Sequence, residues 1–180
     1  DMKTSDLPVT EYSALLKREI KGKTIGVFKT VLDAVKDPVI HDAVDKLADD
    51  LKAAGAHVKE VEMPVELMEL IARVYKTIAN AEATANHSNL DGIRYGMRED
   101  GESVEEVMMN SRTKGFSSYV RARFVIGSYS LFDENQDRLF RKAQKIRRLI
   151  VDAYAKMFED CDVVLAPAAP NVAPLIESAS

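Results

Sequence analysis

Arg123 is the residue whose surroundings best suit binding chemistry. It lies in the mostly apolar stretch 120–126, with Tyr119 four residues before it and Gly127 four residues after it. In a helix these positions lie on adjacent turns, and the glycine leaves space above the guanidinium. An arginine placed there can bind both oxygens of a carboxylate. The residues leave two interpretations open: Arg123 binds the carboxylate of a small ligand, or it pairs with a structural acid.

Tyr75 is a second candidate for binding. The next turns of its predicted helix carry the small residues Ala79 and Ala83. Small side chains beside a phenol leave a space that its hydroxyl can face. Tyr75 therefore either lines a cavity or packs in the core.

A basic run is the strongest charge pattern in the chain. Six cations fall within eleven residues: Arg138, Arg141, Lys142, Lys145, Arg147 and Arg148. Most of them follow a spacing of three and four, which places them on one face of a helix. Such a face either binds RNA phosphates or is simply solvated, and we favour the solvated face.

A glycine-rich phosphate loop is not predicted. Gly22-Lys23-Thr24 resembles the end of such a loop, but Lys17 occupies the position of its first glycine. The predicted strand also follows these residues, whereas a phosphate loop follows its strand. We therefore expect no nucleotide site here.

The sequence assembles no complete catalytic or metal centre. His41, His57 and His87 lack the spacing of zinc ligands and are predicted to be surface or core residues. No serine occupies a glycine-rich elbow, and no Cys–His pair or pair of acids has convincing spacing. We expect no catalytic residue and no metal ligand within this chain.

Composition restricts the class of protein. The 180 residues carry 25 Lys and Arg against 29 Asp and Glu, a net charge of −4, which argues against a dedicated nucleic-acid binder. The single cysteine, Cys161, excludes an internal disulfide and cysteine-ligated metal clusters. No apolar run is long enough to span a membrane, and no leader opens the chain. We expect a cytoplasmic protein whose residues 1–180 form one domain or subdomain.

The first third of the chain predicts a strand, a helix and a second strand. A short helix is expected over residues 12–20, followed by a buried strand at 24–28. Asp37-Pro38 is typical of a capped helix start, and Gly55 ends that helix. A strand over residues 57–63 then completes a parallel pair joined by a helical crossover.

The remaining chain is mainly helical. One apolar stripe follows Pro64, and further helices are expected over residues 104–109, 118–131 and 138–158, with a turn at Asp91-Gly92. Residues 162–165 predict a strand buried on both faces, which Pro167 prevents from continuing. The fold class is α/β with helix in excess.

Several motifs together carry a resemblance to a known family. They are, in order, Asp91-Gly92-Ile93-Arg94-Tyr95-Gly96, Asn110-Ser111-Arg112 with Gly115-Phe116, residues 121–127, Lys142-Ala143-Gln144-Lys145-Ile146-Arg147, and Asp162-Val163-Val164-Leu165-Ala166-Pro167 with Pro170. The order and spacing of these motifs resemble those in the A subunits of bacterial glutamyl-tRNA(Gln)/aspartyl-tRNA(Asn) amidotransferases, which belong to the amidase signature family. The likeness covers nearly the whole chain.

The resemblance implies a partial amidase signature fold, in which a mixed sheet is flanked by helices. It also implies a Ser–Ser–Lys triad that releases ammonia from glutamine by acyl transfer. In the family this triad lies upstream of the matching portion, so we expect the chain to be a fragment of a longer subunit, inactive when alone. The implied partners are the B and C subunits and aminoacyl-tRNA, and the implied cofactors are ATP and magnesium, used by the complex and not by this fragment.

The resemblance assigns roles to the two candidates above. Tyr75 and Arg123 match family residues that line the glutamine pocket, and an aspartate that completes the pocket would follow Ser180. Two features depart from the family: Lys76 stands where a second aromatic is common, and residues 132–137 replace a small, tyrosine-rich stretch. These departures leave open a stand-alone serine amidase, and the basic run leaves open a non-catalytic module that binds RNA or protein.

Overall fold

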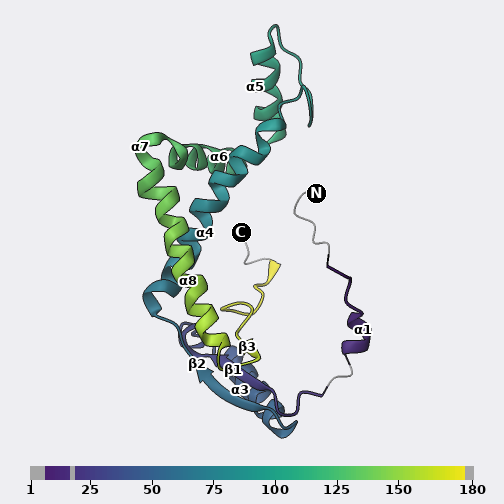
Figure 1. Cartoon of the computed structure of the whole chain (residues 1–180). Helices are drawn as coiled ribbons and strands as arrows, with labels where there is room; N and C mark the ends of the chain where they lie inside the picture. Colours follow the sequence, from purple (N-terminus) through teal and green to yellow (C-terminus); the bar gives the residue numbers. More distant parts are fainter. Residues whose placement is uncertain (1–6, 17–18, 177–180) are drawn as a thin grey trace. The chain divides into compact units, whose positions relative to one another are not determined.

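The chain divides into two units, which are described separately. The computed structural model describes residues 7–16 and 19–176. Unit 1 comprises Asp1–Glu62 together with Met157–Ser180, and unit 2 comprises Met63–Lys156 (Figure 1).

Unit 1 is built on a parallel sheet of three strands. The strands β1 (Thr24–Phe28), β2 (His57–Val61) and β3 (Val163–Leu165) lie in the order β2-β1-β3. The central strand β1 is the most buried, with Phe28 only 2% exposed. A side chain at Gly26 would come within 2.8 Å of Val61 and 3.1 Å of the Cys161 sulfur, so glycine is required for this close packing.

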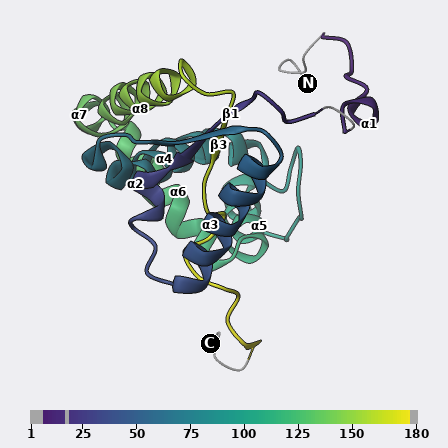
Figure 2. The same cartoon turned by 90° about the horizontal axis from the view of Figure 1, so that it is seen from below.

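The long helix of the crossover between β1 and β2 starts where the sequence predicts. Helix α3 (Pro38–Ala53) starts at Asp37, whose carboxylate accepts a hydrogen bond of 3.0 Å from the Val39 amide. The chain leaves α3 through Gly55, which has a φ of +88° that other residues rarely adopt. Helix α3 then packs against β2 (Figure 2).

Three sequence predictions in unit 1 need correction. Helix α1 (Tyr12–Leu15) is shorter than the predicted 12–20, of which residues 17 and 18 lie outside the described part, and β2 ends two residues before the predicted end. The prediction that β3 is buried on both faces is wrong, because Val163 is 50% exposed. An apolar run favours a strand, but β3 is three residues long and lies at the edge of this sheet. The short helix α2 (Lys29–Leu32), which follows β1, was not predicted.

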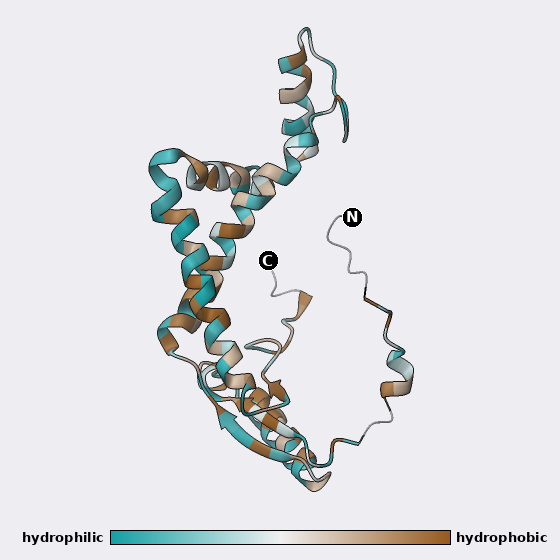
Figure 3. Cartoon of the chain, in the orientation of Figure 1, coloured by the Kyte–Doolittle hydropathy of each residue, from teal (hydrophilic) through white to brown (hydrophobic). Residues whose placement is uncertain are grey.

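Unit 2 is helical, and its core lies between two long helices. Apolar residues of α4 (Val65–Asn86) pack with those of α8 (Lys142–Phe158), and Figure 3 shows hydrophobic residues, in brown, along both helices. The buried members of this cluster are Val74, Ile78, Ala143 and Ile150. A third helix, α6 (Ser118–Leu131), packs against α4 and has the bounds that the sequence predicts.

The connection between α4 and α6 passes through η1 (His87–Asn89), a loop, and α5 (Val104–Gly115). Ser103 caps α5 by accepting a hydrogen bond of 3.2 Å from the Glu106 amide. Helix α5 runs six residues beyond the predicted 104–109, since its weak amphipathic pattern gave no signal after Met109. Gly92, with a φ of +77°, confirms the predicted turn.

The helix predicted over residues 138–158 has an irregular start. A short helix α7 (Asp133–Gln136) leads into a π-helical turn, η2 (Asp137–Arg141), before α8 begins. The basic run in this region is solvent-exposed, and two of its cations pair locally, Arg141 with Asp137 and Arg148 with Asp152. This arrangement agrees with the interpretation of a solvated face.

The structure confirms a helix-rich α/β class, and the three strands described all pair in parallel. Within the described residues no helix combines the length and the apolar character needed to cross a membrane.

Candidate functional site

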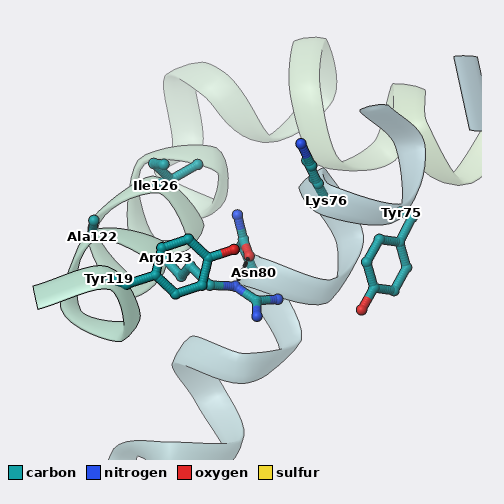
Figure 4. Close-up of a pocket in the computed structure, with 7 residues that line it drawn as sticks. All are labelled: Tyr75, Lys76, Asn80, Tyr119, Ala122, Arg123 and Ile126. Carbon is teal, nitrogen blue, oxygen red and sulfur yellow. Dashed lines mark hydrogen bonds between the residues drawn. The ribbon is translucent and has the colours of Figure 1, made fainter. Parts of the chain in front are cut away.

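A pocket of about 370 Å³ lies in unit 2 between α4 and α6, and it contains both residues singled out from the sequence. Figure 4 shows Tyr75 on α4 and Arg123 on α6 at this pocket. The complete lining is Tyr75, Lys76, Asn80, Tyr119, Ala122, Arg123 and Ile126.

The Arg123 guanidinium is held by a neutral partner. Its Nε donates a hydrogen bond of 2.8 Å to Oδ1 of Asn80, and its Cζ lies 6.0 Å from the centre of the Tyr119 ring. Among residues 7–16 and 19–176 no carboxylate oxygen lies within 4.0 Å of the guanidinium. The structural-acid interpretation is therefore not met in the described chain, and the positive charge of Arg123 faces the pocket without an ionic partner.

Asn80 is a pocket residue that the sequence analysis missed. It is 6% exposed and belongs to the interior of α4, where asparagine is unfavourable because its side chain competes for backbone hydrogen bonds. An asparagine between Ala79 and Ala81 on a long predicted helix was therefore a usable signal. A buried amide needs a partner, and here the partner is Arg123.

Two contacts fix the helices that carry Asn80 and Arg123. The Thr84 hydroxyl lies 2.9 Å from the Asn80 carbonyl oxygen and 3.1 Å from that of Phe124, which links α4 to α6. A Cβ atom at Gly127 would clash with both the Asn80 carbonyl oxygen and the Thr84 hydroxyl oxygen. The prediction that Gly127 makes room for the guanidinium is wrong, because the space it leaves is occupied by the backbone of α4.

Tyr75 and Lys76 form the accessible side of the pocket. Tyr75 is 63% exposed, which excludes the alternative that it is a core residue in the described structure. Lys76 is also exposed and brings a second positive charge to the pocket lining. A pocket with two cations and no lining carboxylate suits an anionic ligand.

The Gly22-Lys23-Thr24 motif has a structural role in unit 1. The Lys23 ammonium lies 2.7 Å from Oδ1 of Asp162, and the Thr24 amide donates to Oδ2 of the same carboxylate at 2.9 Å. These bonds, that of Lys23 first, lower the pKa of Asp162. Thr24 begins β1, which confirms the prediction that the strand follows this motif.

Of the three histidines, His41 and His87 hydrogen-bond to backbone carbonyls, whereas His57, the first residue of β2, is exposed. His41 Nε2 lies 2.8 Å from the Val35 carbonyl oxygen, and His87 Nδ1 lies 2.9 Å from that of Ala83. The His87 ring also packs 5.5 Å from the ring of Phe124. No cluster of potential metal ligands occurs within the part of the chain that the structure describes.

Asp91 organises the loop that follows η1. It is 3% exposed and accepts hydrogen bonds of 2.9 Å from the amides of Ile93 and Arg94 and from the Arg94 side chain. The backbone bond from Arg94, followed by that from Ile93, lowers the pKa of Asp91 to about 2. These contacts lie within one loop, so Asp91 stabilises local structure.

With this geometry established, comparison with known proteins identifies the family. The Amidase family matches residues 1–180, the whole of the chain. The chain belongs to the amidase family. This membership confirms the resemblance seen in the sequence motifs.

Among amidase-family relatives, the chain is similar to proteins named as the A subunit of glutamyl-tRNA(Gln) amidotransferase. It is 37% identical over 173 residues to the protein of Microcystis aeruginosa, covering 96% of this chain and 35% of the relative. It is 40% identical over 169 residues to that of Azotobacter vinelandii, covering 93% and 35%. The chain thus spans about a third of the length of these relatives.

Solved amidase structures share the fold. The A subunit of glutamyl-tRNA(Gln) amidotransferase from Thermotoga maritima aligns over 89% of this chain and 30% of its own, with a TM-score of 0.58 and 24% identity. A bacterial aryl acylamidase of the amidase signature family covers 89% of this chain and 30% of its own, with a TM-score of 0.64 and 17% identity. At these identities the likeness concerns the fold alone.

Proposed function

We propose that the chain forms part of the glutamine pocket in the glutaminase subunit of a tRNA-dependent amidotransferase. The complete subunit releases ammonia from glutamine, and the ammonia converts Glu-tRNA(Gln) or Asp-tRNA(Asn) to Gln-tRNA or Asn-tRNA. Arg123 binds the α-carboxylate of glutamine, and Tyr75 lines the same pocket. The names of the relatives support the reaction, and the pocket supports the roles of these two residues.

The observation that carries the proposal is that the charged Arg123 guanidinium lines the pocket without an acidic partner in the described chain. Asn80 orients this guanidinium, and Lys76 lines the same pocket. A fixed guanidinium binds a carboxylate through two parallel hydrogen bonds, which gives both affinity and orientation. Glutamine bound in this way presents its side-chain amide at a defined distance from its carboxylate.

The chemical step belongs to residues outside these 180. In the proposed mechanism a serine nucleophile attacks the glutamine amide, a lysine acts as base through a second serine, and all three precede this chain. A family aspartate that completes the pocket follows it. We therefore expect the 180 residues alone to bind glutamine weakly, because their pocket is incomplete, and to show no hydrolytic activity.

The remaining roles belong to the proposed complex. The A subunit passes ammonia to a B subunit, which uses ATP and magnesium to activate the tRNA-bound carboxylate, and a small C subunit clamps A to B. We expect this complex to be cytoplasmic. The chain itself contributes glutamine binding and no cofactor site.

Replacing Arg123 by alanine in the complete subunit, assembled with B and C, tests the assignment. The KM for glutamine should rise by roughly ten- to a hundredfold, because the variant loses the charge-assisted hydrogen bonds between the guanidinium and the glutamine carboxylate. The value of kcat should change little. Arg121→Ala is the matched control, because Arg121 is exposed on the same helix and does not line the pocket. An unchanged KM in the Arg123 variant would remove the assignment.

A stand-alone amidase is the second candidate, and Lys76 favours it. Lys76 lines the pocket at a position where amidotransferase subunits commonly carry an aromatic residue, so the pocket can suit another substrate. Purification from the source cell separates the two functions. An amidotransferase subunit should bring B and C with it, whereas an independent amidase should purify alone and hydrolyse amides other than glutamine.

A further inference from the structure

The amide of Asn80 is the only group within the described chain that hydrogen-bonds the Arg123 guanidinium. We propose that Asn80 is a positioning residue, which orients Arg123 and preserves its charge so that the pocket selects amides bearing a carboxylate. This inference rests on the proposed function, since it concerns how the same pocket recognises its substrate.

The position of the hydrogen bond determines which part of Arg123 remains available. A guanidinium has five N–H donors and can bind a carboxylate either through Nε and one Nη or through its two Nη groups. Asn80 occupies the Nε donor at 2.8 Å. The two Nη groups therefore remain as the fork that a ligand carboxylate can approach.

The neutrality of Asn80 matters as much as its position. An aspartate at this site would accept the same hydrogen bond, but its charge would neutralise Arg123 and compete with the ligand carboxylate. The asparagine oxygen orients the guanidinium while the full positive charge remains for the ligand. Lys76 in the same lining adds to this positive potential.

The backbone of α4 at Asn80 is also held in place. The backbone carbonyl oxygen of Asn80 lies 2.9 Å from the Thr84 hydroxyl, which also contacts the backbone carbonyl of Phe124, next to Arg123 in the chain. The same carbonyl faces Gly127 across the interface of α4 and α6. The helix segments that carry Asn80 and Arg123 thus belong to one close contact, and the side-chain bond orders the guanidinium before a ligand binds, which reduces the entropy lost on binding.

Two substitutions at Asn80 test the proposal in the complete subunit, in complex with its partners. Asn80→Leu keeps the approximate size and removes the acceptor, whereas Asn80→Asp keeps the shape and the acceptor and adds a negative charge. Each is assayed with glutamine and with 4-aminobutanamide, which is glutamine without its carboxylate. Asn86→Asp, at the exposed end of α4, is the control for an added charge.

We expect both variants to raise the KM for glutamine by roughly tenfold or more, with kcat little changed. The kcat/KM for 4-aminobutanamide should stay within about twofold of wild type, so that the preference for glutamine falls. A merely structural role predicts the opposite pattern: Asn80→Leu would lower activity toward both substrates equally, and the nearly isosteric Asn80→Asp would change neither. Either of these results, or an unchanged KM for glutamine, would overturn the proposal.

The same assay separates this inference from the proposed function. If the wild-type complex does not hydrolyse glutamine, or if Arg123→Ala leaves its KM unchanged, the proposed function fails. If Arg123→Ala raises the KM but both Asn80 variants behave as wild type, the function stands and the role of Asn80 is wrong.

Discussion

The buried side chains of unit 2 include five polar residues, whereas those of unit 1 are all hydrophobic within the described chain. The polar residues are Asn80, Asp91, Ser111, Ser130 and Asn135. In unit 1 the buried set is headed by Phe28 and Ile25 of the central strand, and its polar pairs, such as Lys23 with Asp162, are exposed.

Each buried polar group of unit 2 has a specific partner. Asn80 accepts from Arg123, Ser111 accepts from the Glu99 amide at 2.9 Å, and Ser130 donates to the Gly127 carbonyl at 2.7 Å. A hydrophobic interior tolerates several packings, but a satisfied buried polar group requires one geometry. The comparison therefore indicates that unit 1 depends on apolar packing, whereas unit 2 also holds particular polar side chains in one geometry, among them Asn80 at the pocket.

The largest effect on stability is expected in unit 1. Phe28→Ala removes a fully buried ring and should lower the free energy of unfolding by about 3–5 kcal/mol, as measured by denaturant titration. Hydrogen exchange should show the loss of protection first in β1 and β2. Val163→Ala, at a half-exposed position of β3, is the control and should cost far less. Equal costs would contradict the view that β1 holds the core of unit 1.

An intermediate effect is expected at the helix contact of unit 2. Gly127→Ala places a methyl group against two oxygen atoms of α4 and should lower stability by about 1–3 kcal/mol, because the helices must separate. It should also raise the KM for glutamine in the complete subunit. Gly115→Ala is the control, since its nearest neighbour would be 3.7 Å away. A Gly127 variant with wild-type stability and KM would show that the α4–α6 contact does not set the pocket.

The smallest effect concerns acid stability. Asp91 has a pKa lowered to about 2, so its hydrogen bonds contribute stability that is complete above its ordinary value near 3.8. This contribution should be lost progressively as the pH falls from about 4 to 2. Unfolding curves of the wild type and Asp91→Asn, compared across this range, isolate the Asp91 contribution. If the difference in the free energy of unfolding between the two proteins does not change with pH, Asp91 makes no such contribution.

Regular elements with local signals were predictable from the sequence. Asp37-Pro38 marks the start of α3 because cap and proline act within one turn, and residues 24–28 and 118–131 have the predicted bounds. Tyr75 and Arg123 were placed in one pocket only by their family resemblance, since they lie on different helices. Their proximity depends on the α4–α6 contact, which no local pattern encodes.

Features that depend on tertiary partners were missed. In the sequence Asn80 is only an unfavourable residue for a helix interior, and its role becomes visible only through its hydrogen bond with Arg123. The exposure of Val163 depends on which strands flank β3 rather than on its own apolar sequence. The start of the last helix was also misjudged, because a 4-3-4-3 apolar spacing does not reveal a turn with i→i+5 hydrogen bonds.

The π-helical turn at Asp137–Arg141 also affects how the basic run meets its surroundings. A π turn contains about one more residue than an α turn, so the helical segments on its two sides are offset by the rotation of about one α-helical residue, roughly 100°. Arg138, which donates to Asn135 at 3.0 Å, is therefore out of phase with Lys145, which an uninterrupted α-helix would place on the same face seven residues later. The six cations thus point in more directions than their spacing suggests. A single-residue deletion within this turn would bring them into line while preserving the helix on either side.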